Sequence, residues 1–319
     1  CKMNIDTPID EPTLDFKQPP RYSRRRMVMG IGLIVVVLGS GWIANKYRLE
    51  RNRQAKIVLD REQRKQRQAN AGEIDEVDLT HNVHPLDQVL LLARKSMRHI
   101  NEDIKDYTAI LQRRERIDDV LLPPSKLAIK IRNVRQNQPL SIYVLFQEPL
   151  GLKGREVIWV QGKDDNKITA HEGGILKLIL GRIHQPHDGF VAMTGNRYSI
   201  AETGIQRMME KLIQYGLSDR NYDECQVQIT DVQSAGVSCQ RVRILHPTAR
   251  DHFDFHIAEV DFDIERKIPV RIATWDWPTE EGGDPLLVEE YIYLNIKLNV
   301  GLVDDDFDPD NEKYDYPEP

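Results

Sequence analysis

Residues 286–299, which read LLVEEYIYLNIKLN, are the clearest indication of the fold of this chain. Apolar and polar side chains alternate along it, as they do on a β-strand whose two faces differ. The two predicted faces are Val288, Ile292, Leu294, Ile296 and Leu298 against Glu289, Tyr291, Tyr293, Asn295 and Lys297. Strands usually have about five or six residues, and a longer strand must twist and curl with its sheet. The stretch therefore predicts a strongly curved antiparallel sheet.

Further strands and two helices are expected on either side of it. The strands are predicted at 126–132, 140–146, 156–161, 167–171, 226–232, 239–245, 252–264 and 268–275. Apolar residues at helical spacing predict a helix over 86–104, with Pro85 at its first position. A second helix is predicted over 203–215, because Thr203 and Gln206 have capping-box spacing and Gly216 is an end signal.

Residues 140–146, LSIYVLF, are apolar on both faces of their strand. A strand of this kind is covered on both sides, so something must lie on each face of the sheet. The best candidate cover is the helical stripe that includes Ile205, Met208, Met209 and Leu212. These four side chains would be ordinary core, or they would line an apolar ligand site beneath a helical lid, since methionine adapts to irregular apolar surfaces.

The N-terminal part of the chain has the pattern of a membrane anchor. Residues 27–44 carry no charge and are long enough to cross a hydrocarbon core. Residues 1–26 precede them as a disordered tail, and residues 45–85 follow as a charged helical stalk and linker. Basic residues flank both ends, and the arginine triplet before the helix favours an N-terminus inside and a C-terminus outside. The sequence therefore predicts a single-pass membrane protein whose residues 86–319 form a domain on the outer side of the bilayer.

Charge and cysteine content restrict the possible partners and compartments. Residues 1–85 hold 15 Lys or Arg and 11 Asp or Glu, whereas residues 86–319 hold 29 and 39. The domain is acidic, which argues against nucleic-acid binding. Cys225 and Cys239 would form a disulfide in an oxidising compartment, but a hairpin turning at 234–236 places Cys225 nearer to Ile244 than to Cys239. Cys1 is compatible with a lipid-modified start, although we favour an unusual chain start because no apolar signal precedes it.

One cluster resembles a metal site. If residues 252–264 form a strand, His252, Asp254 and His256 share a face, and two imidazoles with a carboxylate can bind zinc. The same alternation is that of a strand with a polar outer face and an aromatic inner face, which is the interpretation we favour. The sequence contains no phosphate loop, nucleophile elbow or zinc-protease helix, so we expect no catalytic residues and no cofactor.

A series of short motifs carries a resemblance to a known family. The motifs include Asp106-Tyr107-Thr108-Ala109, Arg113-Arg114-Glu115-Arg116, Lys130-Ile131-Arg132, Tyr143, Pro149, Gly154–Trp159, Ala170-His171, His246-Pro247, Pro269-Val270, Glu290–Tyr293, Asp306-Phe307-Asp308, Asn311 and Tyr314. In this order, over about residues 86–317, they resemble the bacterial envelope family called domain of unknown function 1571. That family resembles the outer-membrane lipoprotein carrier (LolA-like) fold. The resemblance implies a mainly β (α+β) domain, a curved antiparallel half-barrel with helices as a lid. It also implies a periplasmic setting for residues 86–319, which would place the predicted anchor in the cytoplasmic (inner) membrane.

Three functions are compatible with these observations. The first is a non-catalytic domain that binds an acyl or lipid-type ligand or a lipoprotein in the concavity of the sheet. The second is a structural or protein-interaction module of the cell envelope, with the same space filled by side chains. The third is a metal-dependent hydrolase built on His252, Asp254 and His256. The first is our prediction.

Overall fold

The computed structural model describes residues 78–79 and 83–318. By its contacts the chain divides into two compact units, Cys1–Asn52 and Arg53–Pro319, and the described residues belong to the second. The predicted tail, the predicted membrane helix and nearly all of the predicted stalk lie outside the described residues. Among the described residues, no helix is long and apolar enough to cross a membrane.

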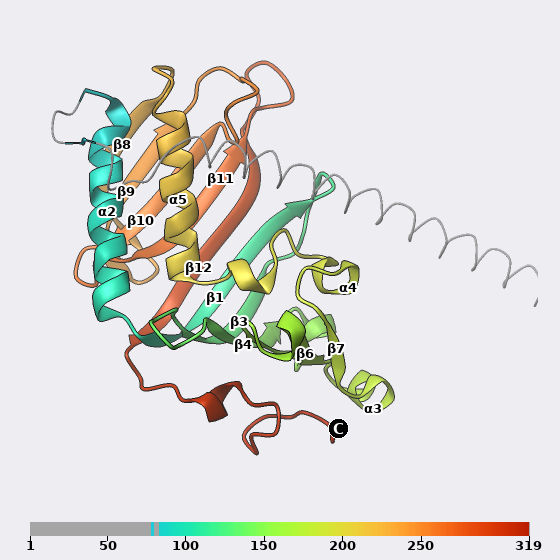
Figure 1. The fold of residues 1–319 in the computed structure, drawn as a ribbon. Coiled ribbons are helices and arrows are strands. Elements are labelled where there is room, and N and C mark those ends of the chain that lie inside the picture. Colours follow the sequence, from blue (N-terminus) through green and yellow to red (C-terminus); the bar gives the residue numbers. More distant parts are fainter. Residues whose placement is uncertain (1–77, 80–82, 319) are drawn as a thin grey trace, which may run out of the picture. The chain divides into compact units, whose positions relative to one another are not determined.

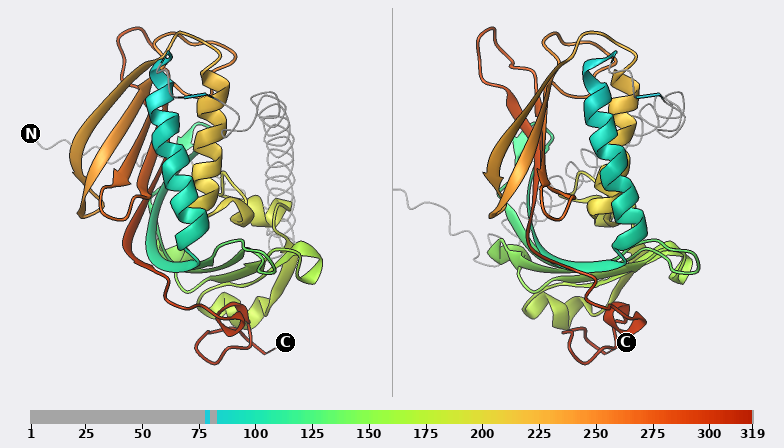
Figure 2. Two further views of the ribbon diagram at one scale, coloured as in Figure 1. Left: turned by 60° about the vertical axis from the view of Figure 1, so that its left-hand side comes forward. Right: turned by 90° about the vertical axis from the view of Figure 1, so that its left-hand side faces the viewer.

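One continuous antiparallel sheet forms the framework of the second unit (Figure 1). Its strand order is β7-β6-β5-β4-β3-β1-β12-β11-β10-β9-β8, with the short β2 beside β1. The strands are β1 (Asp106–Ile117), β2 (Val120–Leu121), β3 (Ser125–Arg132), β4 (Ser141–Glu148), β5 (Glu156–Val160), β6 (Lys167–His171), β7 (Ile183–Pro186), β8 (Gln226–Ser234), β9 (Val237–Leu245), β10 (Ile257–Asp263), β11 (Pro269–Asp276) and β12 (Leu286–Leu298). The two views of Figure 2 show the strong curvature that the length of residues 286–299 predicts.

The two longest strands, β1 and β12, pair with each other and join the two halves of the sheet. The residue pattern predicted β12 but not β1, whose sequence DYTAILQRRERI is too charged for simple alternation. Charged side chains of β1 form hydrogen bonds and ion pairs with neighbouring groups. Glu115, for example, is 4% exposed and accepts hydrogen bonds from the Tyr291 hydroxyl and the Arg197 backbone N–H.

A β-bulge at Asn295 divides β12 into two parts, and the alternation of its side chains between the two faces of the sheet reverses there. Residue Ile110 pairs with Leu294 and Thr108 with Lys297, so one residue of β1 opposes two of β12. Asn295 has a φ of 54°, a left-handed value that asparagine tolerates. Before the bulge the core side is that of Tyr291 and Tyr293, and after it the side of Ile296 and Leu298. The prediction that all the alternating apolar residues share one face was therefore wrong.

Two helices, α2 (Pro85–Asp103) and α5 (Ile205–Asp219), lie side by side over one face of the sheet (Figure 2). The helix predicted from Pro85 is confirmed, and its first turn is capped by the His84 side chain. The helices approach closely at Gly216, where a Cβ would lie 2.9 Å from Leu90 Cδ2. Gly216 is therefore a packing residue inside α5, and the prediction that it ends the helix was wrong.

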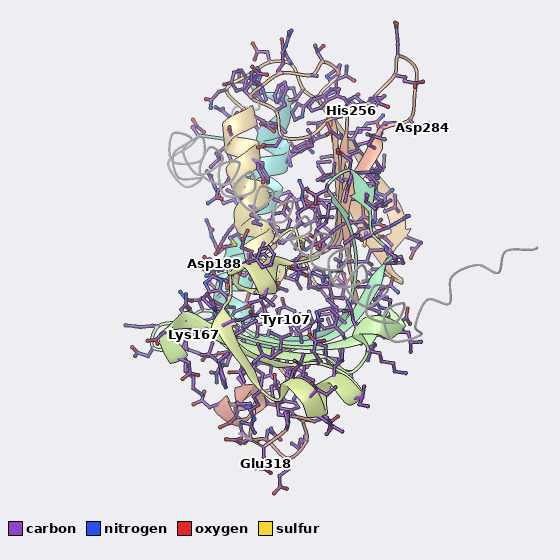
Figure 3. The ribbon with its side chains drawn as sticks, turned by 90° about the vertical axis from the view of Figure 1, so that its right-hand side faces the viewer. Tyr107, Lys167, Asp188, His256, Asp284 and Glu318 are labelled. Atoms are coloured by element: carbon purple, nitrogen blue, oxygen red, sulfur yellow. The ribbon has the colours of Figure 1, made fainter. Side chains whose placement is uncertain are left out.

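The N-terminus of α5 is capped by the sheet and not by Thr203. The N-cap residue is Gly204, with a φ of 118° and no side-chain cap of its own. Instead, the Ile205 backbone N–H donates to the Tyr107 hydroxyl at 2.8 Å. The Gln206 side chain donates to Asn101 of α2. Figure 3 shows Tyr107 between the sheet and this end of α5, so tertiary contacts replaced the predicted capping box.

Strand β4 is covered on both faces, as the sequence of residues 140–146 predicts. Ile142, Val144 and Phe146 belong to the main core beneath the helices. Tyr143, on the other face, forms a second cluster with Ile158 of β5 and Phe307. The second cover is the C-terminal segment 302–316, which crosses the outer face of the sheet (Figures 2 and 3).

The β8–β9 hairpin agrees with its prediction, because Ser234 pairs with Val237 and the turn lies between them. This register places Cys239 opposite Val232, and both Cys225 and Cys239 are free thiols. The disulfide alternative is therefore not realised in the fold.

Candidate functional site

The four side chains that the sequence offered either as ordinary core or as the lining of a ligand site under a lid lie in the core. Ile205, Met208 and Met209 are 2%, 8% and 0% exposed, and Leu212 packs against them from a partly buried position. Their stripe faces α2 and the sheet, where it completes the main hydrophobic cluster. The prediction that this stripe covers the sheet is confirmed, and the side chains of the stripe contact other side chains of the core.

The structure places the candidate zinc residues in a turn before β10. Strand β10 begins at Ile257, so the predicted strand 252–264 starts five residues too early. The His252 ring stacks on Tyr222 at 3.6 Å between centroids, and His256 Nδ1 donates to the His246 carbonyl oxygen at 2.8 Å. Phe253 and Phe255 are buried, as the favoured interpretation of an aromatic inner side predicts. Within 78–79 and 83–318, no three His, Cys, Asp or Glu residues are arranged to hold a metal ion.

The most unusual surface lies elsewhere, on the short helix α3 (Ile175–Leu180) between β6 and β7 (Figure 1). Its sequence, ILKLIL, has five aliphatic residues in six positions. Ile175, Leu176, Leu178, Ile179 and Leu180 are 72%, 47%, 78%, 68% and 52% exposed. Isolated exposed aliphatic side chains are common on proteins, but a contiguous group indicates an interaction site. We name these five side chains the α3 ridge.

The polar residues of this segment attach α3 to the body of the domain. Lys177, whose side chain is 19% exposed, forms an ion pair with Asp315 of the C-terminal segment at 2.5 Å. Just after the helix, Arg182 pairs with Asp310 at 2.6 Å and donates to the Pro317 carbonyl oxygen. The charged groups therefore point to the protein, and the aliphatic groups of the α3 ridge point away from it.

The base of α3 is held by a close backbone contact that requires glycine. A Cβ on Gly173 would lie 1.9 Å from the Lys153 carbonyl oxygen, in the loop between β4 and β5. Glu172 and Arg155 bridge the same two loops with an ion pair at 2.8 Å. That neighbouring loop also carries Leu150, which is 86% exposed. The two loops thus bring exposed aliphatic residues to one edge of the sheet.

The C-terminal segment is itself fixed to the outer face by a polar and aromatic network. Lys130 Nζ lies 2.7 Å from Asp306 and donates to the Tyr314 hydroxyl, and the Tyr143 and Tyr314 rings stack at 4.3 Å. Burial raises the pKa of Glu156, but the His171 imidazole 3.5 Å away and hydrogen bonds from the Tyr143 hydroxyl and the Asp315 backbone N–H lower it by more, so the pKa of this carboxyl is depressed. Many of the residues that carried the family resemblance meet here, and their arrangement is that of a structural attachment.

The sequence analysis did not identify α3 as a site. Six residues are too few to show helical periodicity, and an apolar run of this length resembles a buried strand. The available signal was the Gly173-Gly174 pair before the run and Gly181 after it, because Gly174 and Gly181 adopt φ values of 60° and 59°. Such punctuation indicates that a segment leaves the sheet.

Comparisons with known proteins identify the family and offer distant similarities of structure. A family model described as "Protein of unknown function (DUF1571)" matches residues 104–316. No curated protein sequence matches the chain. Among solved structures, a DUF1329 family protein from Desulfovibrio piger has 10% identity and a TM-score of 0.35, with 71% of this chain and 98% of that chain covered.

Two further structures are similar at the same level. An outer membrane lipoprotein-sorting protein domain from Vibrio parahaemolyticus has 10% identity and a TM-score of 0.34, covering 68% of this chain and 95% of its own. MucB in its complex with MucA from Pseudomonas aeruginosa has 11% identity and a TM-score of 0.37, covering 68% and 59%. The family match spans two thirds of the chain and agrees with the resemblance found in the sequence, so this chain belongs to the DUF1571 family of proteins of unknown function.

Proposed function

We propose that this protein is a membrane-anchored, periplasmic, non-catalytic binding domain, and that it binds an apolar acyl or lipid-type partner through the α3 ridge. The observation that carries the proposal is the exposure of five aliphatic side chains on one six-residue helix. Burying apolar surface is the main favourable term in association, and an exposed contiguous group offers that surface without unfolding the domain. The anchoring and the compartment are supported by residues 27–44 and by the charges beside them.

This proposal moves the predicted binding surface from the concave face to the edge of the sheet. The concave side is where α2 and α5 pack, with Met209 fully buried. A ligand there would have to displace core side chains, whereas a ligand on α3 displaces only water. The binding energy of an acyl chain, about 0.8 kcal/mol per buried CH₂, is therefore easier to obtain at the ridge.

A binding measurement with matched variants tests the proposal. Leu178 and Ile179 are 78% and 68% exposed, and full burial of such a side chain contributes about 2 kcal/mol. The double variant Leu178→Ser, Ile179→Ser should then lose about 3 kcal/mol of binding energy, which is roughly a hundredfold in Kd for a fluorescent fatty acid. The control variant Val83→Ser, Ile264→Ser removes aliphatic side chains that are 82% and 54% exposed elsewhere and should bind normally.

Residues 53–319 suit this experiment, because they form one compact unit and omit the predicted membrane helix. If this unmodified unit is folded and binds no acyl ligand, the acyl-binding proposal is wrong. The membrane part is tested separately on the full chain, by fusing a reporter that is active only in the periplasm after Pro319. Activity of a cytoplasm-only reporter at that position would contradict the orientation and the compartment.

A protein-interaction module is the second candidate function. It is favoured by the filled core beneath α5, because the same ridge would then bind a protein instead of a lipid. Unchanged stability, no acyl binding and a partner lost only in the Leu178→Ser, Ile179→Ser variant would identify this alternative.

A further inference from the structure

The direction in which each residue of α3 points restricts the kind of partner it can accept. At about 100° per residue, the five aliphatic positions cover an arc of about 200°, and Lys177 alone lies outside it. That lysine is the residue paired with Asp315, so the remaining arc faces outward. On every side of α3 that does not face the domain, the side chains are therefore aliphatic.

A helix that binds a protein groove normally has one apolar stripe and a polar back that stays in water. Here Leu178 and Leu180 lie on opposite sides of the arc and are 78% and 52% exposed. A groove wide enough to cover both sides would have to enclose the helix. An apolar helix without a polar outer face is typical of insertion into an apolar medium. A lipid layer offers such a medium around the whole arc.

The chain outside the described residues provides a membrane within reach. If residues 27–44 span a bilayer, the 33 residues 45–77 connect it to the domain. They would extend about 50 Å as a helix, at 1.5 Å per residue, and at most about 110 Å when fully extended. The α3 ridge is then confined to the neighbourhood of the same bilayer, which raises its effective concentration there.

The way α3 is attached to the domain also indicates which property of a membrane its contact would depend on. Lys177 and Arg182 are neutralised by Asp315 and Asp310, whose side chains are 75% and 67% exposed. These two ion pairs therefore add no net positive charge beside α3, so they provide no attraction to anionic headgroups. The contact depends on the aliphatic side chains.

From these observations, and resting on the proposed function, we infer that the partner of the α3 ridge is the lipid bilayer that holds the anchor, into which α3 inserts. Leu178 and Ile179, whose side chains are 78% and 68% exposed, enter the acyl-chain boundary. Lys177 and Arg182 remain bound to the C-terminal segment at the membrane surface. The domain would thus be fastened at two points, by residues 27–44 and by α3.

The test uses the full chain reconstituted in phosphatidylcholine vesicles. An environment-sensitive fluorophore is attached to Leu178→Cys, with Cys1→Ser to remove the terminal thiol; Cys225 and Cys239 are buried. The matched control carries the label at Val303→Cys, since Val303 is also exposed, at 57%. We expect a blue-shifted emission at position 178 that brominated acyl chains quench, no quenching at position 303, and no gain when phosphatidylglycerol is added.

Three results would overturn the inference. They are an unquenched, water-like emission at position 178, a blue shift without quenching (which indicates a protein surface or a second copy of the chain), and quenching that requires anionic lipid. The fatty-acid measurement on residues 53–319 separates this inference from the proposed function. Acyl binding that depends on Leu178 and Ile179, without bilayer quenching, would leave the proposed function standing and refute the insertion.

Discussion

Replacing Met209 by alanine distinguishes a packed helix α5 from a lid over an open space. Met209 is 0% exposed and lies in the core shared by α2, α5 and the sheet. Truncating a buried methionine to alanine costs about 2–5 kcal/mol, since apolar contacts are lost and a cavity is left. We expect the free energy of unfolding to fall by about 3 kcal/mol, because Met209 is inaccessible to solvent and water would not fill the cavity.

The assay is urea unfolding of residues 53–319, followed by tryptophan fluorescence and circular dichroism. For a protein of this size the dependence on urea is about 2–3 kcal/mol per molar, so the midpoint should fall by about 1 M. Val191→Ala is the control, because Val191 is 62% exposed and its truncation should change stability by less than about 0.5 kcal/mol. A loss below about 1 kcal/mol for Met209→Ala would refute the packed arrangement and restore the lid hypothesis.

Three further predictions follow from buried groups. Burial lowers the pKa of His246 to about 4, so the unfolded chain binds the proton first and stability should be lost as the pH falls from about 6.5 towards 4. At about 1.4 kcal/mol per pKa unit, the loss should be about 2–3 kcal/mol by pH 4.5, and His246→Asn, which retains an N–H for the Phe255 carbonyl, should reduce the change of the urea midpoint between pH 7 and pH 4.5. Phe307→Ala removes a side chain that is 2% exposed and should cost about 3 kcal/mol of the attachment of segment 302–318, seen as faster amide exchange there; unchanged exchange would mean that the ion pairs suffice. Burial raises the pKa of both cysteine thiols of the domain to about 11, so neither should be alkylated at pH 8 until the protein unfolds, and rapid labelling of the native protein, measured by mass spectrometry of the peptides, would contradict their burial.

Residue spacing alone was enough to predict the elements whose signal is local and periodic. Residues 86–104 and the stripe of 205–213 have helical spacing, and both became helices that cover the sheet. The alternating run in residues 286–299 became the 13-residue β12. The two-sided apolar run in residues 140–146 required a second cover, and the structure has one. Such patterns predict structure well because the spacing of apolar residues shows directly whether one face or both faces of an element are buried.

Features that depend on contacts between distant segments could not be predicted from residue spacing. The bulge at Asn295 reverses the facing of β12 because β1 is its partner, and the Tyr107 hydroxyl caps α5 across 98 residues of sequence. The outer cover of β4 is the acidic C-terminal segment, held by Lys130 and its aromatic neighbours. The same segment pairs with Lys177, which turns the one charged residue of α3 inward and leaves its aliphatic residues in water. From its sequence alone, an apolar hexapeptide is expected to lie in the core. Whether it is buried or exposed depends on the groups that the rest of the chain brings to its one polar side chain.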